Sequence, residues 1–187
     1  SPYLATGSIS PRFLYWEIKR YESTRNKSNS TYWLVHEMFW RDFVRFQGYY
    51  VGDKMFKIGG LYDTHPDWPW SYDKRVFKAW VDGDTGFPFL DACAREIAAT
   101  GYSCHIGRET LGWFLCVDTG LDWRMGGEWF ESILIDYEPC ANWYWVLSSF
   151  FYSDFLFLFD LIVFDEFSGS VWYWTIFLYS AAKPKTG

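Results

Sequence analysis

The chain has 187 residues and a mass of 22.3 kDa, which suits one well-packed domain and is too short for two. Aromatic residues make up 24% of it, more than one core of this size can bury, so we expect either that many rings serve a ligand or partner, or that part of the chain is not an evolved core. The net charge of −6 and the isoelectric point of about 5.0 argue against a free-standing, nonspecific nucleic-acid-binding protein, without excluding a local basic patch.

The first two predicted helices lie near the N-terminus. Ser10 and Pro11 provide an N-cap and a first-turn proline, and residues 12–25 follow with an amphipathic pattern. Thr31 is expected to cap a second helix over residues 32–47. One face of that helix carries a carboxylate, an indole and two guanidinium groups, which belong to Glu37, Trp40, Arg41 and Arg45.

A long loop is predicted over residues 48–71, because its glycines and prolines disfavour regular helix. Loops of this length inside a compact domain usually have a function. Helical patterns resume further along the chain, over residues 72–83, 87–101, 107–118 and 121–138. No stretch alternates between apolar and polar residues as a strand does, so the sequence predicts an all-α fold.

The composition changes abruptly after Asn142. Of the 40 residues that follow it, 16 are aromatic and none is a lysine or arginine. We therefore expect one partial domain over residues 1–142 and an aberrant hydrophobic tail over residues 143–187. Aspartates interrupt the apolar run of this tail, which favours aggregation-prone sequence over a membrane span.

Two explanations of the tail remain open. Translation of a T-rich noncoding stretch gives a Phe-rich, Lys-poor sequence of this kind, so an error in the gene model or in splicing would produce it. A real but divergent terminus is the alternative. The nucleotide sequence across the Asn142 codon decides between them, because an intron boundary there would exclude divergence.

The start of the chain and its cysteines bear on its compartment. The opening SPYLATGSIS has neither an initiator methionine nor a basic and apolar leader, which predicts no secretory signal and a start inside a longer protein. The four cysteines form no CxxC pair and the three histidines do not join them at metal-ligand spacing, so we expect buried free thiols and no metal site. We expect a location within the cell, with the nucleus, chloroplast and mitochondrion all open.

Four stretches carry a family resemblance. They read SPYLATGSISPRFLYWEIKRYE, STYWLVHEMFWRDFVRF, TGFPFLDACAREIAATGY and GLDWRMGGEWFESILIDYEPCAN, and begin at residues 1, 30, 85 and 120. Together they resemble the FAD-binding domain of the photolyase and cryptochrome family, most closely its DASH branch. The resemblance covers residues 1 to about 142 and implies part of an all-helical domain that holds a U-shaped FAD beneath a DNA-facing cavity.

The resemblance also implies an activity. In such proteins blue light excites reduced flavin, which passes an electron to a flipped-out cyclobutane pyrimidine dimer and splits it, and the DASH branch is associated with single-stranded DNA and with light signalling. The expected enzyme class is a deoxyribodipyrimidine photo-lyase. The folate-type antenna pigment belongs to an N-terminal domain that we expect to be missing, so we expect a fragment with impaired activity.

The resemblance assigns FAD-binding positions to Ser1, Arg41, Arg108, Asp136, Glu138 and Asn142. Arg108 and Asp136 match a pair that lies beside the isoalloxazine ring, where two parallel hydrogen bonds fix orientation; a plain core ion pair is the alternative. Glu138 stands where the family usually has aspartate, so one extra methylene can displace its contact. Asn142 matches an asparagine near flavin N5, which favours photolyase-like over plant-cryptochrome-like redox behaviour.

An electron relay of three tryptophans is a further feature of the family. Trp70 and Trp123 match its outer and middle members, and with Asn142 they are the expected catalytic residues. Val146 holds the flavin-proximal position, and the nearby tryptophans Trp143 and Trp145 are out of register. We therefore expect a relay that is broken at its first hop.

The expected DNA contacts are Glu37, Trp40, Arg45 and His105. Glu37 and Trp40 match the carboxylate and the indole that contact and stack on the flipped dimer, with ordinary helix packing as the alternative for Trp40. Around His105 the family's asparagine, arginine and glutamine are replaced by histidine, isoleucine and glutamate. Losing a base and gaining an acid should weaken binding to a phosphate backbone.

Three functions follow as hypotheses. The first is an FAD-dependent photolyase-type enzyme acting on pyrimidine dimers in DNA. The second is a light-sensing flavoprotein without repair activity, to which the substitutions around His105 point. The third is a noncatalytic remnant that associates through its aromatic tail. Flavin absorption, photoreduction and dimer splitting distinguish them.

Overall fold

The computed structural model describes residues 1–60, 68–144 and 146. The chain divides into two units, Ser1–Phe150 and Phe151–Gly187, and the second lies wholly outside the described residues. The predictions for the hydrophobic tail therefore fall outside them too, beyond residue 146. The described part is built from helices and contains no strand, only an isolated bridge between Ser71 and Leu121, which confirms the all-α prediction.

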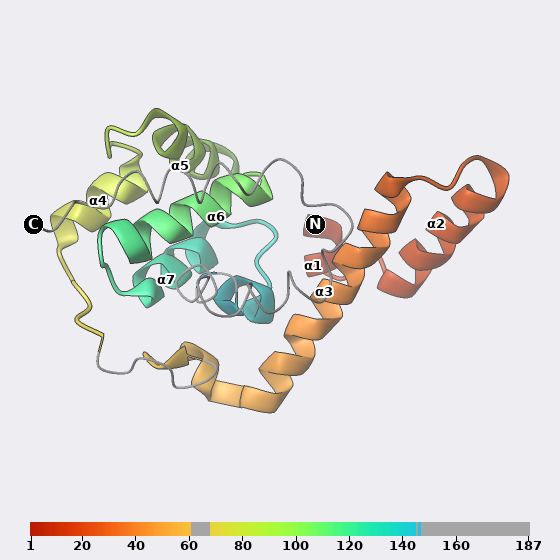
Figure 1. The fold of residues 1–187 in the computed structure, drawn as a ribbon, viewed down its shortest axis with the longest axis horizontal. Helices are drawn as coiled ribbons and strands as arrows, with labels where there is room; N and C mark the ends of the chain where they lie inside the picture. The colour runs from red at the N-terminus through yellow and green to blue at the C-terminus, as the bar shows by residue number, and fades with distance from the viewer. Residues whose placement is uncertain (61–67, 145, 147–187) are drawn as a thin grey trace, which may run out of the picture. The chain divides into compact units, whose positions relative to one another are not determined.

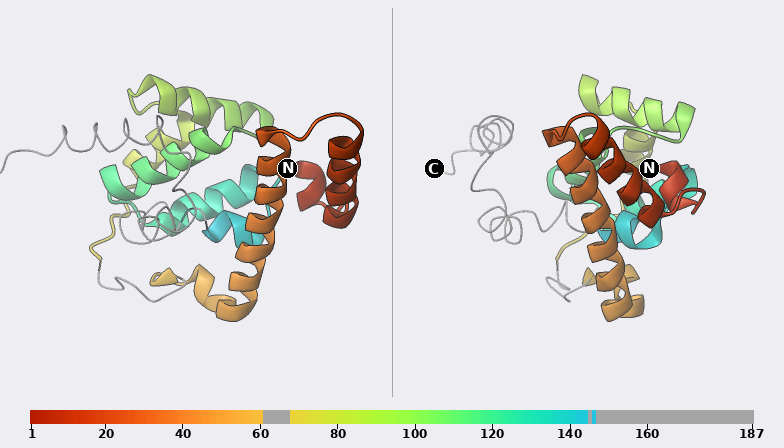
Figure 2. Two further views of the ribbon diagram at one scale, coloured as in Figure 1. Left: turned by 45° about the vertical axis from the view of Figure 1, so that its right-hand side comes forward. Right: turned by 90° about the vertical axis from the view of Figure 1, so that its right-hand side faces the viewer.

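The helices follow one another along the chain as Figure 1 shows. Their bounds are α1 Pro2–Ala5, α2 Pro11–Thr24, α3 Asn29–Val51, the 3₁₀ helix η1 Gly52–Phe56, α4 Lys74–Asp82, α5 Pro88–Thr100, α6 His105–Trp113, the π-helical turn η3 Phe114–Asp118, and α7 Trp123–Ile133. Residues 139–144 are helical as well. In Figure 1 and in the left view of Figure 2 the long α3 runs beside α2, and α4, α5, α6 and α7 form a cluster on the side of α3 away from α2.

Helix α3 begins earlier and ends later than the sequence predicts. Its N-cap is Ser28 and not Thr31, because the two side chains form a capping box in which each accepts a hydrogen bond from the other's backbone N–H. The helix then runs through Gly48 to Val51, so the predicted loop over residues 48–71 is wrong in its first part. A Cβ on Gly48 would lie 2.5 Å from Cys140 Sγ, so this glycine permits close packing and does not end the helix.

The buried core lies among α4, α5, α6 and α7, where α5 packs on both α4 and α6, and α7 packs on η3. Its fully buried large side chains are Trp80, Ile97, Leu111, Leu115, Leu121 and Trp123. Glycines in the left-handed conformation, Gly83 and Gly101, end α4 and α5, as predicted for Gly101. These short, capped helices hold the start of α6 and the end of α7 in fixed positions, and both ends contribute to the site described below.

Two adjacent glycines in α7 let it approach its neighbours closely. A Cβ on Gly126 would lie 2.4 Å from Leu115 Cδ2, and a Cβ on Gly127 would lie 2.9 Å from the indole ring of Trp143. Trp143, Tyr144 and Val146 are each about 5% exposed or less, so the packed core continues past Asn142.

The cysteines differ from their prediction. All four are free, but Cys93 and Cys116 alone are buried, whereas Cys104 is exposed and Cys140 is half-buried. Burial raises the pKa of the Cys116 thiol, which keeps it protonated. Within the described residues, no group of three or more potential ligands could hold a metal ion, and no helix is both long and apolar enough to cross a membrane.

Candidate functional site

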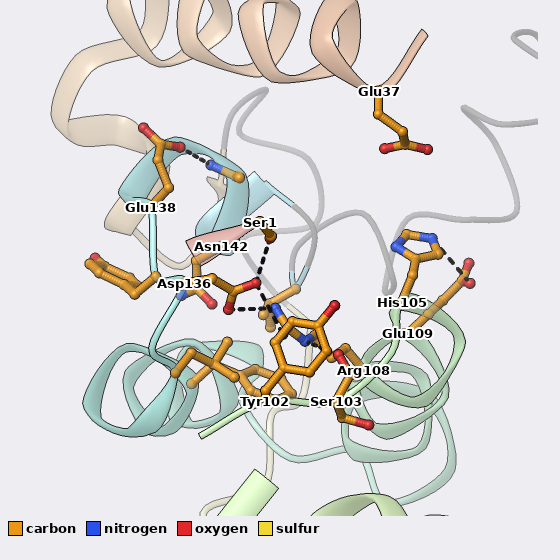
Figure 3. A pocket seen from close by; sticks show the side chains of 16 residues that line it. Ser1, Glu37, Tyr102, Ser103, His105, Arg108, Glu109, Asp136, Glu138 and Asn142 are labelled. Atoms are coloured by element: carbon orange, nitrogen blue, oxygen red, sulfur yellow. Dashed lines mark hydrogen bonds and ion pairs between the residues drawn. The ribbon is translucent and has the colours of Figure 1, made fainter. Parts of the chain in front are cut away.

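A cavity of about 270 Å³ opens between α3, the start of α6 and the segment that follows α7 (Figure 3). This volume is close to the lower end of the range for ligand pockets, about 300–1,000 Å³. Its lining includes Ser1 and residues from four further regions of the chain. In order, the lining is Ser1, Glu37, Tyr102, Ser103, His105, Arg108, Glu109, Gly112, Phe130, Leu134, Asp136, Tyr137, Glu138, Ala141, Asn142 and Val146.

The floor of the cavity is an ion pair between Arg108 and Asp136. The distance from Nη1 to Oδ1 is 3.0 Å, and Nη2 donates to Oδ2 at 3.2 Å. Arg108 is oriented by two further contacts: its Nε donates to the Ser103 carbonyl at 2.9 Å, and its guanidinium lies 4.8 Å from the centre of the Tyr102 ring. Ser1 Oγ donates to Asp136 Oδ2 at 2.6 Å. The carboxylate therefore has a fixed orientation.

One oxygen of this carboxylate keeps an unused acceptor capacity. Asp136 Oδ1 is buried and touches Arg108 Nη1, yet no N–H or O–H of the described residues is directed at it with hydrogen-bond geometry. Buried carboxylate oxygens usually accept hydrogen bonds, and an unsatisfied one calls for an explanation. A ligand group with an N–H or O–H donor would satisfy Oδ1. The pyrimidine part of a flavin carries such a donor, so this acceptor is compatible with FAD.

Glu138 and Asn142 also line the cavity and are already hydrogen-bonded. Glu138 Oε1 accepts from Arg45 Nε at 3.1 Å, and its Oε2 accepts from the backbone N–H of Ala141 at 2.8 Å. Asn142 Nδ2 donates to the Gly127 carbonyl at 3.1 Å. The amide of Asn142 is thus held by α7, with the residue itself lining the cavity.

The mouth of the cavity combines acids with one imidazole. Glu37 projects from α3 toward His105, which lies at the start of α6 (Figure 3). His105 Nε2 is 3.7 Å from Glu109 Oε2, one helical turn further on. Counting Asp136 and the glutamate at position 138, four carboxylates face this cavity together with one guanidinium. Such a lining disfavours a polyanion at the mouth.

Not every predicted residue lies at the cavity. Of the predicted FAD and DNA positions, Ser1, Glu37, His105, Arg108, Asp136, Glu138 and Asn142 line it. Trp40 and Arg41 are outside the lining, where Trp40 contacts the rings of other α3 residues and Arg41 lies 3.1 Å from Asp42. Arg45 reaches the site through Glu138, which it contacts as an ion pair.

Sequence reasoning missed several lining residues, among them Tyr102, Ser103 and Tyr137. A signal for the first two exists, because they directly precede α6, the helix that carries Arg108. Tyr137 adjoins Asp136 in sequence, and burial raises its pKa to about 12, so that it stays a neutral phenol. Contacts of this kind depend on how α7 and α6 meet, which the sequence does not state.

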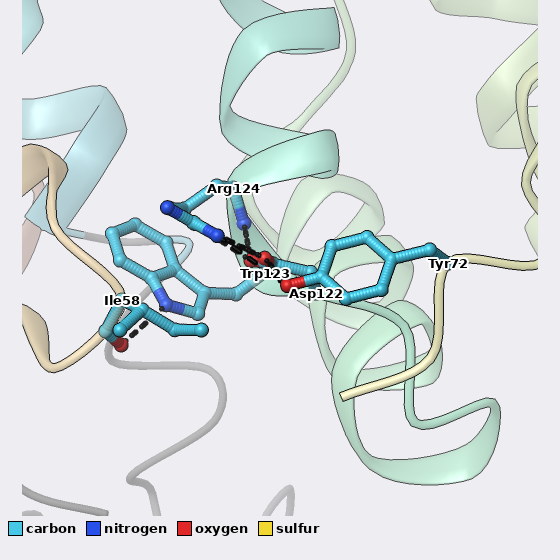
Figure 4. Close-up of polar contacts among 5 residues, drawn as sticks. All are labelled: Ile58, Tyr72, Asp122, Trp123 and Arg124. Carbon is cyan, nitrogen blue, oxygen red and sulfur yellow. Dashed lines mark hydrogen bonds and ion pairs between the residues drawn. The ribbon is translucent and has the colours of Figure 1, made fainter. Parts of the chain in front are cut away.

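The predicted relay tryptophans lie near one another in the chain's fold. The Ser71–Leu121 bridge joins the segment after Trp70 to the one before Trp123. Trp123 is fully buried, and its Nε1 donates to the Ile58 carbonyl at 3.2 Å (Figure 4). Its ring centre is 5.6 Å from that of Trp143.

The start of α7 is fixed by a buried carboxylate. Asp122 is 1% exposed and accepts hydrogen bonds from the Arg124 backbone and guanidinium and from Tyr72 Oη, the last at 2.9 Å (Figure 4). Burial raises the pKa of Asp122, but these hydrogen bonds outweigh it and hold the pKa below its usual range. The cluster joins the loop before α4 to the helix that carries Trp123.

The described part of the chain is helical, and a buried aspartate paired with an arginine lies beneath a small cavity, which is the arrangement of a helical ligand-binding domain. The family model for the FAD-binding domain of DNA photolyase matches residues 33–159, and the chain belongs to this family. The matched range extends beyond Asn142.

Relatives and solved structures agree with this membership. The chain is 49% identical over 143 residues to cryptochrome DASH of Synechocystis, covering 76% of this chain and 29% of that protein. It is 47% identical over the same length to a cryptochrome DASH of Arabidopsis thaliana that is named chloroplastic/mitochondrial, covering 76% and 25%. This chain therefore spans between a quarter and a third of these relatives.

Two crystal structures share the fold. That of the Synechocystis cryptochrome matches with a TM-score of 0.78 and 47% identity, covering 80% of this chain and 31% of the other. That of a class III photolyase from Agrobacterium tumefaciens matches with a TM-score of 0.73 and 30% identity, covering 80% and 30%. The helical arrangement described above is thus shared with both a cryptochrome and a photolyase.

Proposed function

We propose that this chain forms the ion-pair side of an FAD pocket in a blue-light-absorbing flavoprotein of the cryptochrome DASH and photolyase type. The proposed reaction is light-driven electron transfer from reduced FAD to cyclobutane pyrimidine dimers in single-stranded DNA. The observation that carries the proposal is Asp136 Oδ1, a buried acceptor without a directed hydrogen bond at the floor of the cavity. Family membership supports FAD as the group that supplies the donor.

The chain's own residues have separate tasks in this proposal. When bound, FAD supplies light absorption and one-electron chemistry. Arg108 and Asp136 orient the group, because the guanidinium is itself held by Ser103 and Tyr102. The fixed guanidinium also stabilises negative charge that develops beside it. Asn142 provides a neutral amide at the cavity wall, which does not oppose such charge.

In the same proposal, some of the predicted DNA-contacting residues line the cavity and others do not. Glu37 and His105 line the mouth of the cavity, which supports the proposal that they contact the edge of a base that enters it. Arg45 acts indirectly, since its guanidinium is engaged by Glu138. Trp70 and Trp123 remain proposed relay members, and Trp40 and Arg41 remain proposed contacts outside the lining.

A second candidate function is light sensing without dimer repair. The observation that favours it is the pair of acids at the mouth of the cavity, Glu37 and Glu109, because the carboxylates of Asp136 and Glu138 are already in ion pairs with arginines. Binding of DNA depends on neutralising phosphates with lysine and arginine, and an acidic mouth works against it. This candidate keeps the FAD site and the photochemistry and removes only the DNA step.

One experiment separates the candidates. The purified chain is incubated with FAD, freed of excess flavin, and illuminated with blue light under nitrogen in the presence of a thiol reductant. Oligonucleotides with one cyclobutane dimer, single-stranded or double-stranded, are then added and dimer loss is measured by chromatography. Photoreduction with loss of the single-stranded dimer is the expected result. Photoreduction without dimer loss supports the sensing candidate, and the lack of both in folded protein overturns the two and leaves a noncatalytic remnant.

A further inference from the structure

Trp143 is a buried indole whose surroundings differ from those of the other core tryptophans. It is 5% exposed, and its ring lies against Gly127, which has no side chain to obstruct it. The ring centres of Trp123 and Phe56 lie 5.6 Å and 5.2 Å from its own. These contacts hold the indole in one orientation inside an apolar environment.

The indole N–H of Trp143 faces an acid. Nε1 is 3.2 Å from Glu131 Oε2 and 3.3 Å from Tyr137 Oη, so the two oxygens share one donor. Glu131 lies on the exposed side of α7, which leaves its carboxylate in contact with water. A proton that leaves the buried indole therefore has a base beside it and a route to solvent.

Two other buried tryptophans provide a comparison within the same core. Trp80 Nε1 donates to the Leu111 carbonyl at 3.1 Å, and Trp123 Nε1 donates to a peptide carbonyl in the same way (Figure 4). A peptide carbonyl accepts a hydrogen bond but does not take up the proton. A carboxylate does both, and its negative charge stabilises the cation that forms when an indole loses an electron.

We propose that Trp143 is an electron-donating side chain whose indole proton passes to the Glu131 carboxylate when the electron leaves. The electron goes to a one-electron oxidant, the N–H bond of Trp143 breaks, and an O–H bond forms on Glu131 Oε2. The product is a neutral indolyl radical. A small thiol returns the electron, and the proton returns from Glu131.

The position of Trp143 connects this chemistry to the cavity. Tyr137 lines the cavity and lies 3.3 Å from Trp143 Nε1, and the Trp123 ring packs edge-on against the indole. The importance of Trp143 for a light-driven reaction rests on the proposed function. There, Trp143 would be the electron donor next to the cavity, because the position expected for that donor is occupied by Val146. The donor chemistry itself requires no flavin.

The test uses the full chain without FAD. A photoexcited ruthenium polypyridyl complex with persulfate as final acceptor oxidises the protein, and ascorbate is added to reduce radicals on exposed side chains. Radicals that survive are followed by transient absorption and electron paramagnetic resonance. The variants are Trp143→Phe and Glu131→Gln. Their matched controls are Trp16→Phe, at a side chain that is 67% exposed, and Glu128→Gln, at another exposed glutamate of α7.

The expected result is a long-lived neutral tryptophanyl radical in the wild type and in both controls. It should be lost in Trp143→Phe and reduced about tenfold in Glu131→Gln, since one partly screened charge at this range changes an equilibrium by about that factor. An undiminished radical in Trp143→Phe would place the electron hole on another residue. An unchanged yield and lifetime in Glu131→Gln, a substitution at an exposed site that should leave folding intact, would also overturn the proposal. Because no flavin is present, neither outcome depends on whether the chain binds FAD.

Discussion

The ion pair between Arg108 and Asp136 predicts an asymmetric response to mutation. The Asp136 side chain is 3% exposed and that of Arg108 is 24% exposed. Arg108→Met leaves a buried carboxylate with Ser1 as its remaining donor, and we expect a loss of about 3 kcal/mol of unfolding free energy, at the low end for a broken buried pair. Asp136→Asn leaves an arginine that still reaches water and the Ser103 carbonyl, and we expect a loss of about 1 kcal/mol.

The double variant Arg108→Met/Asp136→Asn completes the cycle. Because it leaves no unpaired charge, we expect a loss of about 1.5 kcal/mol, well below the roughly 4 kcal/mol sum of the single losses. The coupling of about −2.5 kcal/mol is measured by urea denaturation, followed by circular dichroism at pH 7. All four proteins must show the same dependence of unfolding free energy on urea concentration. Additive losses, or a larger loss for Asp136→Asn than for Arg108→Met, would refute the claim that Asp136 is the buried member of the pair and needs Arg108 to compensate its charge.

Three further predictions concern the helices that carry the site. Asp122→Ala should lower the free energy of unfolding by about 3 kcal/mol, because it removes a helix cap and charged hydrogen bonds. Asp73→Ala, at the N-cap of α4, should lower it by about 1 kcal/mol. Equal losses in urea denaturation would contradict this comparison. Because the pKa of Asp122 is lowered in the folded state, its carboxylate stabilises the protein above the unfolded pKa of about 3.9, and this contribution is lost as pH falls through the folded pKa. The loss of unfolding free energy in Asp122→Asn should therefore shrink between about pH 5 and about pH 2. A loss that does not change with pH would refute this prediction. Gly127→Ala should lower the free energy of unfolding by about 1–3 kcal/mol, because the new Cβ would clash with the Trp143 ring. The loss should be much smaller in a Trp143→Phe background. Equal losses in both backgrounds would exclude this clash.

The parts of the fold that local chemistry sets were predictable from sequence. The Ser10 and Pro11 signal marks the start of α2, and Gly101 ends α5 in the left-handed conformation. Helix α3 was predicted too short, because Gly48 has the sequence signature of a breaker. Its packing against Cys140 explains why a glycine stands there, and a contact across 92 positions leaves no local signal.

In the candidate site, too, some features could be predicted from the sequence and others depend on tertiary packing. The resemblance named Arg108 and Asp136 as partners, and the structure brings their side chains to 3.0 Å. It gave no indication that Arg45 pairs with Glu138, because they were assigned to different ligands. It also treated Trp143 as out of register, since register along the chain does not show which rings meet across α7. Burial, partners and cavity position come only from tertiary packing.

The central claim, an FAD site at the Asp136 carboxylate, is tested most directly by titrating flavin against the folded chain. The quenching of FAD fluorescence is followed for the wild type, for Asp136→Asn, and for Asp82→Asn, whose carboxylate side chain is 48% exposed on α4. We expect saturable binding to the wild type and to Asp82→Asn, and about tenfold weaker binding to Asp136→Asn, which corresponds to the loss of one charged hydrogen bond. Failure of the folded wild type to bind FAD, or equal affinities for all three proteins, would contradict the account.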